Sequence, residues 1–296
     1  MLTTSRKVWR GTDQVQWSVI FVKVHILADN RAAGRGILAE HGLSVFIEHD
    51  SMNILFDTGQ SNVYRINAER MAVDLSKVDY IVLSHGHYDH CGGLIHFPAY
   101  DEFPKVYVHK DAFNSKYALN QDGETYREIG IPWGLDDLGV LRENIVLTEG
   151  NVSLAPGINL IREIPYVTSF ERPHPFLYTG DALSKSPDIM KDEQMLVIAG
   201  NEGLIIFLGC SHPGIINCVN HALSMFPGKN VETLLAGMHL DKVSPQHLNM
   251  TIRHLLDLGI KRVIPLHCTG ILAITEMRRL MGDRCLMLCA GDSLEL

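Results

Sequence analysis

The sequence predicts an α/β fold in which two sheets pack face to face and part of each sheet is parallel. Apolar segments of strand length alternate with segments of helical spacing in both halves of the chain, which is typical of an α/β sandwich. Four of the strand segments end at or near a histidine, the pattern that a shared metal-binding edge requires. The chain of 296 residues contains no segment of linker composition, so residues 1–296 are expected to form one domain.

The first half of the chain begins with strands and then enters an apolar run. Residues 19–26 read as a first strand, and residues 43–48 and 53–56 read as a hairpin. Residues 61–71 look helical, and the apolar run at 80–83 is typical of a buried parallel strand. We further expect a strand at 105–109, a short helix at 110–119, an irregular segment at 124–133, strands of the second sheet at 144–147, 152–154 and 158–164, and a long loop at 168–193 that covers the site.

The second half of the chain repeats the alternation of strand and helix. Ser244 is a good N-cap and Pro245 a good first-turn residue for a helix that reaches Leu258. The spacing of Ile215 and Val219 places apolar side chains on one face of another helix. The expected elements are strand segments at 204–214, 231–240 and 263–270, each ending at or near a histidine, helices at 215–226, 245–258 and 271–281, and a closing strand at 285–288.

Metal-ligand side chains crowd the end of the apolar run at 80–83. His85, His87, Asp89 and His90 follow it within six positions, with glycines that allow tight turns between them. Neutral imidazole and carboxylate are ligands that zinc accepts. A lone histidine is more often a satisfied core or surface group, but this cluster at a strand end predicts a metal site. Two ions held roughly 3.5–4 Å apart would form a dinuclear hydrolytic or transfer site.

Composition excludes several classes of protein. The net charge of −8 argues against a non-specific nucleic-acid binder, which usually carries a basic face, although a local basic pocket for phosphate stays possible. The six cysteines form no C-x-x-C pair or dense framework, so reduced thiols in a cytoplasmic protein are expected. We expect neither a signal peptide nor a membrane span, because no apolar run approaches 18 residues.

The ligand cluster reads H-x-H-x-D-H, and an upstream D-T-G turn is present at Asp57, Thr58 and Gly59. In these two motifs the sequence resembles the metallo-β-lactamase superfamily. The resemblance implies a four-layer αββα sandwich with metal ions at one edge, between the two sheets. It also implies that His212, in G-C-S-H-P-G, joins His85 and His87 on a first metal. His267 would join Asp89 and His90 on a second metal.

The sequence departs from the superfamily pattern at the aspartate that usually bridges the two metals. The matching position is Met238, which is a poor ligand for a hard dication. Asp181 lies in a G-D pair but in the wrong chain order, Cys210 offers a bridging thiolate, and His239 offers a pocket lining. One or two zinc ions are expected, with other divalent metals possible. The di-iron members carry Glu where this chain has His87.

Residues 39–44, 209–215, 237–240 and 266–270 resemble a narrower branch, the 7,8-dihydropterin-6-methyl-4-(β-D-ribofuranosyl)aminobenzene-5′-phosphate synthase group. That resemblance implies a transferase of pterin cofactor synthesis, in which a dihydropterin pyrophosphate loses pyrophosphate to an aminobenzene ribosyl phosphate. The candidate catalytic residues are Asp89, His239 and His41; the two histidines would contact substrate or shuttle a proton.

Two other functions use the same residues. A zinc metallo-hydrolase would act on an ester, lactone or phosphodiester, and fold resemblance alone does not separate it from the transferase. A non-catalytic metal-binding protein would have a closed ligand shell instead of an open coordination position. The expected partner is a small, phosphorylated substrate, with no nucleic acid and no membrane; the oligomeric state is open.

Overall fold

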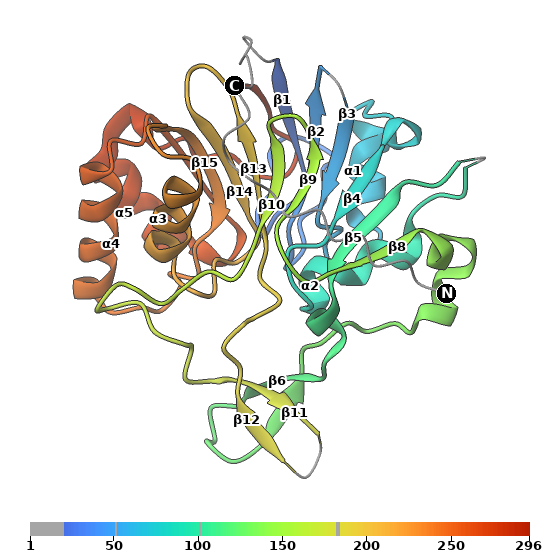
Figure 1. Ribbon diagram of the computed structural model, residues 1–296, viewed down its shortest axis with the longest axis horizontal. Helices are drawn as coiled ribbons and strands as arrows, with labels where there is room; N and C mark the ends of the chain where they lie inside the picture. The colour runs from blue at the N-terminus through green and yellow to red at the C-terminus, as the bar shows by residue number, and fades with distance from the viewer. Residues whose placement is uncertain (1–20, 51, 101, 182–183) are drawn as a thin grey trace.

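Two large β-sheets face each other in the computed structural model, which describes residues 21–50, 52–100, 102–181 and 184–296 (Figure 1). The seven-stranded first sheet has the order β17-β1-β2-β3-β4-β5-β8, and the six-stranded second sheet has the order β16-β15-β14-β13-β10-β9. A four-stranded small sheet has the order β12-β11-β6-β7. The strands are β1 (Val22–Ala28), β2 (Ser44–His49), β3 (Met52–Phe56), β4 (Tyr80–Val82), β5 (Lys105–His109), β6 (Lys116–Leu119), β7 (Tyr126–Glu128), β8 (Ile145–Thr148), β9 (Val152–Ala155), β10 (Ile158–Ile161), β11 (Leu177–Gly180), β12 (Lys185–Pro187), β13 (Met195–Ala199), β14 (Leu204–Leu208), β15 (Val231–Gly237), β16 (Arg262–Leu266) and β17 (Ser293–Glu295).

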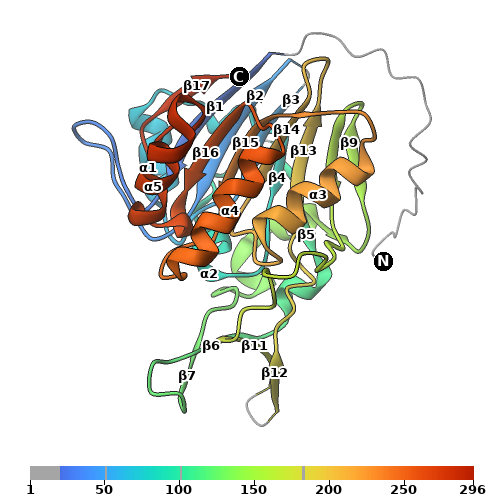
Figure 2. The same cartoon turned by 90° about the vertical axis from the view of Figure 1, so that its left-hand side faces the viewer.

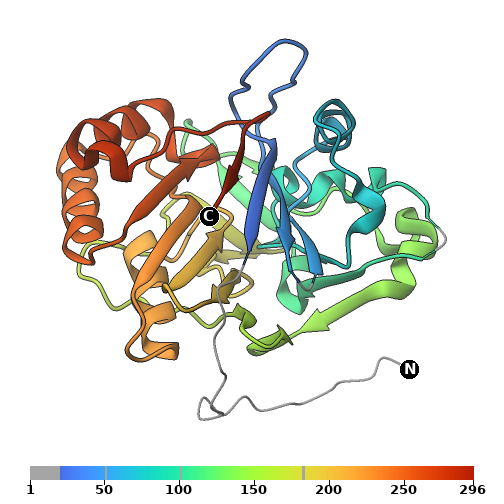
Figure 3. The ribbon, with the colours of Figure 1, turned by 90° about the horizontal axis from the view of Figure 1, so that it is seen from above.

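Helices cover the outer face of each large sheet, as the view from above shows (Figure 3). The helices are α1 (Val63–Arg70), α2 (Tyr88–Cys91), α3 (Ile215–Met225), α4 (Pro245–Asp257) and α5 (Ile271–Met281). The first two pack against the first sheet, and the other three pack against the second sheet. The predicted start of α4 is confirmed, because Ser244 Oγ accepts a hydrogen bond from His247 N at 3.2 Å and Pro245 occupies the first turn.

Side chains of the central strands alternate between two apolar layers, which explains their continuous apolar sequence. In β3, Ile54 and Phe56 point into the core between the sheets, whereas Leu55 packs on the helix-covered face. In β14, Phe207 faces the core between the sheets and Ile206 faces the helices. The rings of Phe56 and Phe207 meet across the sandwich with centroids 6.3 Å apart. These layers confirm the four-layer αββα architecture.

The parallel strands of both sheets end at one edge of the sandwich. Strands β3, β4, β5 and β8 run parallel in the first sheet, and β14, β15 and β16 run parallel in the second. Segments that follow the carboxyl ends of these strands therefore gather at the same rim, the usual ligand-binding edge of α/β sheets.

Predictions for the middle of the chain are wrong in four places. Residues 124–133 are not irregular throughout, because β7 lies within them and pairs with β6. Residues 110–119 form a 3-10 helix at Lys110–Phe113 followed by β6, not one helix. Strand β8 pairs with β5 in the first sheet, not with the second sheet. The segment 168–193 is not a plain loop, because β11 and β12 form a hairpin within it. Short strands with polar side chains carry little alternation, so the small sheet left no clear pattern in the sequence.

The two ends of the chain also differ from expectation. Residues 285–288 form no strand, and Cys285 makes one isolated bridge to Val263. The closing strand of the chain is β17, which pairs with β1 at the edge of the first sheet. The first strand begins at Val22, and the start of the predicted segment 19–26 lies outside the described residues. Within the described ranges, no helix is long and apolar enough to cross a membrane.

The small sheet projects from the rim of the sandwich, below α2 in Figures 1 and 2. A buried cation holds it there: Lys116 Nζ lies 2.8 Å from Asp188 Oδ2 and 2.8 Å from Asp192 Oδ1. Asp192 Oδ2 also accepts a hydrogen bond of 2.7 Å from Gly86 N, within the ligand cluster. The small sheet is thus tied directly to the loop that carries His85 and His87.

Candidate metal centre

Four strands end at the rim with a residue in the left-handed backbone region. Such a backbone costs roughly 1–2 kcal/mol for a side-chain-bearing residue, so neighbouring contacts must hold each turn. His267 N donates a hydrogen bond of 2.6 Å to Asp29 Oδ1, and Ser211 N donates one of 3.0 Å to Glu193 Oε1. The four residues are Asp57 after β3 (φ 58°), Ser211 after β14 (φ 54°), His239 after β15 (φ 49°) and His267 after β16 (φ 47°).

Three histidines from two sheets form a first group of donors. Ring nitrogens of His85, His87 and His212 all lie within 4.8 Å of one another, and the three side chains are buried. His85 and His87 follow β4, and His212 follows β14. The ring centroid of His212 is 4.9 Å from that of each of the other two. The structure thus brings together the three residues assigned to a first metal.

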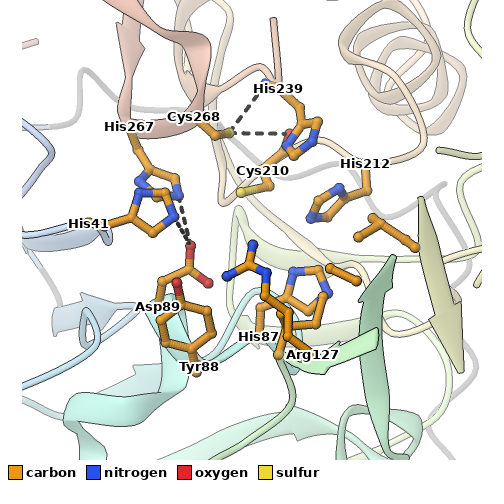
Figure 4. A pocket seen from close by; sticks show the side chains of 13 residues that line it. His41, His87, Tyr88, Asp89, Arg127, Cys210, His212, His239, His267 and Cys268 are labelled. Carbon is orange, nitrogen blue, oxygen red and sulfur yellow. Dashed lines mark hydrogen bonds and ion pairs between the residues drawn. The ribbon is translucent and has the colours of Figure 1, made fainter. Parts of the chain in front are cut away.

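A second group surrounds the carboxylate of Asp89. Its Oδ2 atom lies 3.1 Å from His41 Nε2 and 3.3 Å from His267 Nε2 (Figure 4). The same atom lies 4.0 Å from His90 Nε2. The donor atoms of His41, Asp89 and His267 lie within 4.8 Å of one another. His41 therefore stands beside the expected second metal ligands, where the sequence offered it only as a substrate contact or proton shuttle.

Cys210 lies between the two groups. Its sulfur is 3.1 Å from His90 Nε2, and it forms close donor groups with His85 and His90 and also with His239 and Cys268. Of the residues considered in place of the missing aspartate, His239 lines the cleft, whereas Asp181 lies elsewhere, as does Met238 at the matching position. Met238 packs in the core between the second sheet and its helices. Asp181 follows β11 and its Oδ1 accepts a hydrogen bond from Ser184 N, outside the donor groups found among the described residues.

Asp57 orients the histidines of the first sheet from behind. Its Oδ2 accepts hydrogen bonds of 2.7 Å from His90 Nδ1 and 2.7 Å from Ser84 Oγ, and its Oδ1 accepts one from Ser84 N. Ser84 Oγ in turn lies 2.9 Å from His85 Nδ1. These contacts occupy the Nδ1 atoms, as outer partners of metal ligands do. The Nε2 atoms point to other donors, because His85 Nε2 lies 3.0 Å from His87 Nδ1 and His90 Nε2 lies 3.1 Å from Cys210 Sγ.

Burial and charge set the protonation of the site. Burial lowers the pKa of His85, His87 and His212 well below the usual imidazole value, which favours the neutral form that binds metals. Burial would raise the pKa of Asp89, but the neighbouring histidines outweigh it and hold that pKa well below its usual range. For His90, burial is outweighed by the Asp57 and Asp89 carboxylates, which raise its pKa to about 9.

The cleft in front of these groups has a volume of about 100 Å³ and is partly open to solvent. The small sheet supplies one wall through Ala118 of β6, Arg127 of β7 and Leu177 of β11. Arg127 reaches toward the donors in Figure 4, and Tyr88 lines the cleft with it. The site thus combines metal-type donors with a cation at the mouth, which suits an anionic substrate.

The residues present fit a metal ion. Both ring nitrogens of His212, and Nε2 of His87, are buried without a hydrogen-bond partner. A buried polar atom without a partner costs roughly 1–3 kcal/mol, and coordination to an ion would remove that cost. Because His212 is only 6% exposed, bulk water does not reach its ring freely.

Sequence reasoning missed several residues around the site. In the sequence, Asp57 stands out only as part of the D-T-G turn. No motif or spacing there marks Glu193, Lys116 or Arg127 as a site residue. Glu193 is fully enclosed; burial, and next the Asp192 carboxylate, raise its pKa to about 8. Its Oε2 atom lies 3.9 Å from His85 Nδ1. These side chains come from segments far apart in the chain, so only the folded structure reveals their proximity.

Comparisons with known proteins agree with the fold and the motifs. A family model described as the metallo-beta-lactamase superfamily matches residues 38–239. The chain is 33% identical over 258 residues to an uncharacterized protein of Methanocaldococcus jannaschii, covering 87% of this chain and 94% of that protein.

Two further relatives have descriptive names. The chain is 30% identical over 271 residues to the 7,8-dihydropterin-6-methyl-4-(beta-D-ribofuranosyl)-aminobenzene-5'-phosphate synthase of Methanocaldococcus jannaschii, covering 85% of this chain and 89% of the synthase. It is 28% identical to a protein of known structure described as a metal-dependent hydrolase of the beta-lactamase superfamily, with a TM-score of 0.77 and coverage of 93% and 99%. The fold, the ligand cluster and these matches together show that the chain belongs to the metallo-β-lactamase superfamily.

Proposed function

We propose that this protein is a metal-dependent transferase that displaces pyrophosphate from a dihydropterin pyrophosphate with an aminobenzene ribosyl phosphate. The observation that carries the proposal is the convergence of metal-type donors from both sheets on a cleft whose mouth carries Arg127. The relative named as a synthase of this chemistry supports the transfer reaction.

The donors divide between two zinc positions. His85, His87 and His212 would hold one ion, and Asp89, His90 and His267 would hold the other. A bound divalent ion would supply Lewis-acid stabilisation of the charge that grows on the departing phosphate oxygens. Burial lowers the pKa of His85, His87 and His212, so these three imidazoles favour the neutral form that binds a metal.

The remaining residues bind and orient the substrate. The planar guanidinium of Arg127 suits bidentate binding of a phosphate or pyrophosphate group. His41 and His239 line opposite sides of the cleft, where an imidazole can accept the proton of the attacking amine or donate one to the leaving group (Figure 4). Ile129 and Leu177 give an apolar surface for a ring system.

A direct assay separates this reaction from its alternatives. The zinc-loaded protein is given a dihydropterin pyrophosphate together with the aminobenzene ribosyl phosphate, and pyrophosphate release and the coupled product are measured. We expect both to appear in equal amounts and to be lost in His87→Ala. The exposed Leu272 on α5 provides a matched control, since Leu272→Ala should retain activity. Pyrophosphate release without coupled product would contradict the transferase.

The second candidate function is a zinc metallo-hydrolase, favoured by the relative described as a metal-dependent hydrolase. The same protein is then tested on bis-p-nitrophenyl phosphate, an aryl ester and a lactone. Turnover of one of these, combined with no coupled product in the transfer assay, would replace the first proposal with the second. Absence of all these activities in a metal-loaded protein would favour a non-catalytic metal-binding role.

A further inference from the structure

Two cysteines lie in the wall of the cleft. Cys210 follows β14 and Cys268 follows β16, and both line the cleft together with His239 (Figure 4). Their sulfurs and a ring nitrogen of His239 lie within 4.8 Å of one another. The Cys210 sulfur also groups with His85 and His90, and it is 3.1 Å from His90 Nε2. Cys210 therefore joins the histidines of the first sheet to the donors of the second.

Three other cysteines pack in apolar cores, and Cys210 does not. Cys218 and Cys285 belong to the apolar core between the second sheet and its helices. Cys91 belongs to the core on the outer face of the first sheet, where its sulfur contacts His85 O at 2.9 Å. Cys210 is 3% exposed but belongs to none of the apolar cores formed by the described residues. The groups near its sulfur are the imidazoles of His85, His90 and His239 and the thiol of Cys268.

A separate observation also points to a ligand beside this sulfur. The ring of His212, two positions after Cys210, is buried with neither nitrogen hydrogen-bonded. Its ring centroid lies 4.7 Å from that of His239, a member of the sulfur group. The unpartnered ring nitrogens of His212, together with the unpartnered Nδ1 of His239, indicate that an ion completes this part of the site.

We propose that Cys210 is a thiolate ligand of the metal centre, which makes the centre selective for thiophilic ions such as zinc, iron(II) or cobalt(II) over magnesium and manganese. The inference rests on the proposed metal centre. On binding, the thiol proton passes to solvent and the sulfur donates an electron pair to the ion, so uptake releases a proton. Cys268 has a different role: its sulfur accepts a hydrogen bond of 3.2 Å from His239 N and holds that turn.

Cobalt(II) spectroscopy tests the ligand without reference to activity. The full-length protein loaded with cobalt(II) should show a near-ultraviolet thiolate-to-cobalt charge-transfer band. Cys210→Ser should abolish this band and weaken cobalt binding by at least roughly 10- to 100-fold, the loss typical of disturbing a metal site. Two control variants should retain the band. Cys268→Ser removes the neighbouring thiol in the cleft, and Cys289→Ser removes a thiol remote from the cleft.

A second variant keeps the test informative if Cys210→Ser folds poorly. Cys210→Asp offers a hard oxygen ligand, so it should bind two ions, show no charge-transfer band and lose at least roughly tenfold of its preference for zinc over manganese. If the wild-type protein takes up cobalt but shows no band, Cys210 is not a ligand, while the proposed metal centre stands. A band lost only in Cys268→Ser would also overturn Cys210 as the ligand. Failure of the wild-type protein to take up cobalt would overturn the metal centre as well.

Discussion

His90 donates a hydrogen bond from Nδ1 to Asp57 Oδ2 at 2.7 Å, and both residues are fully buried where neighbouring parallel strands of the first sheet end. The same carboxylate accepts two hydrogen bonds from Ser84, which contacts His85. One side chain of the D-T-G turn thereby fixes the orientation of two candidate ligands.

Asp57→Asn tests this orienting role. The amide keeps the shape of the side chain but loses the charge and one acceptor, so metal affinity should fall roughly 10- to 100-fold. Titration with a chelator of known affinity measures the loss. Asp283→Asn is the matched control, because that carboxylate is fully exposed and remote from the cleft. If Asp57→Asn and Asp283→Asn bind the metal with equal affinity, Asp57 does not orient the metal ligands.

Lys116→Met tests the attachment of the small sheet. Removing the ammonium leaves Asp188 and Asp192 buried without their cation, so the free energy of unfolding should fall by about 3–5 kcal/mol. Urea denaturation measures the change. Lys110→Met is the control, because its pair with Glu149 is exposed and should contribute little to the free energy of unfolding. Similar losses in the two variants would contradict a special role for the buried cluster.

Glu193 should make the metal-free protein less stable as pH rises. The unfolded chain loses this proton near the ordinary carboxyl value of 4.5, whereas the folded chain keeps it until about 8. Between those values the folded state binds the extra proton, so the free energy of unfolding falls by about 1 kcal/mol per pH unit. His90, whose pKa is about 9, adds a decline above its ordinary value of 6.5.

Urea denaturation across this range, compared with Glu193→Gln, isolates the carboxyl group. The variant should lose the slope between about pH 5 and pH 6.5 and retain the decline that His90 gives at higher pH. An unchanged slope in the variant would assign the pH dependence to other groups.

Arg127→Ala tests the anion-binding wall. Loss of hydrogen bonds from a charged donor costs about 1.5–3 kcal/mol, so KM for the phosphorylated substrate should rise at least roughly tenfold while metal content stays unchanged. Arg127→Lys should recover only part of the loss, since an ammonium binds phosphate without the planar fork. Arg142→Ala, at an exposed ion pair with Asp136, serves as the control. Unchanged KM in Arg127→Ala would place the phosphate elsewhere.

The sandwich was predictable because its strands are buried on both faces. Segments such as β4 and β14 are apolar without interruption, and each leads into a ligand motif. The small sheet was not predictable, since β7 is wholly exposed and β12 is only three residues long. Polar short strands have no period that distinguishes them from loops.

The site also has a part that the sequence predicts and a part that it does not. The H-x-H-x-D-H cluster is local in sequence, and the later histidines, His212 and His267, each follow an apolar strand segment. Their residue types and strand-end positions predicted that they would meet the cluster. The placement of His41 beside Asp89 depends on how a loop folds over the rim, and that of Lys116 between two aspartates depends on the small sheet. Neither relationship has a spacing that sequence reasoning can read.

The most direct test of the central claim is the metal content of protein purified without chelator. We expect about two ions per chain if both positions fill, falling sharply in His87→Ala and His212→Ala. His254→Ala, an exposed histidine on α4, should leave the content unchanged. If the two cleft variants instead keep the wild-type metal content while remaining folded, the convergence of these imidazoles is not a metal centre.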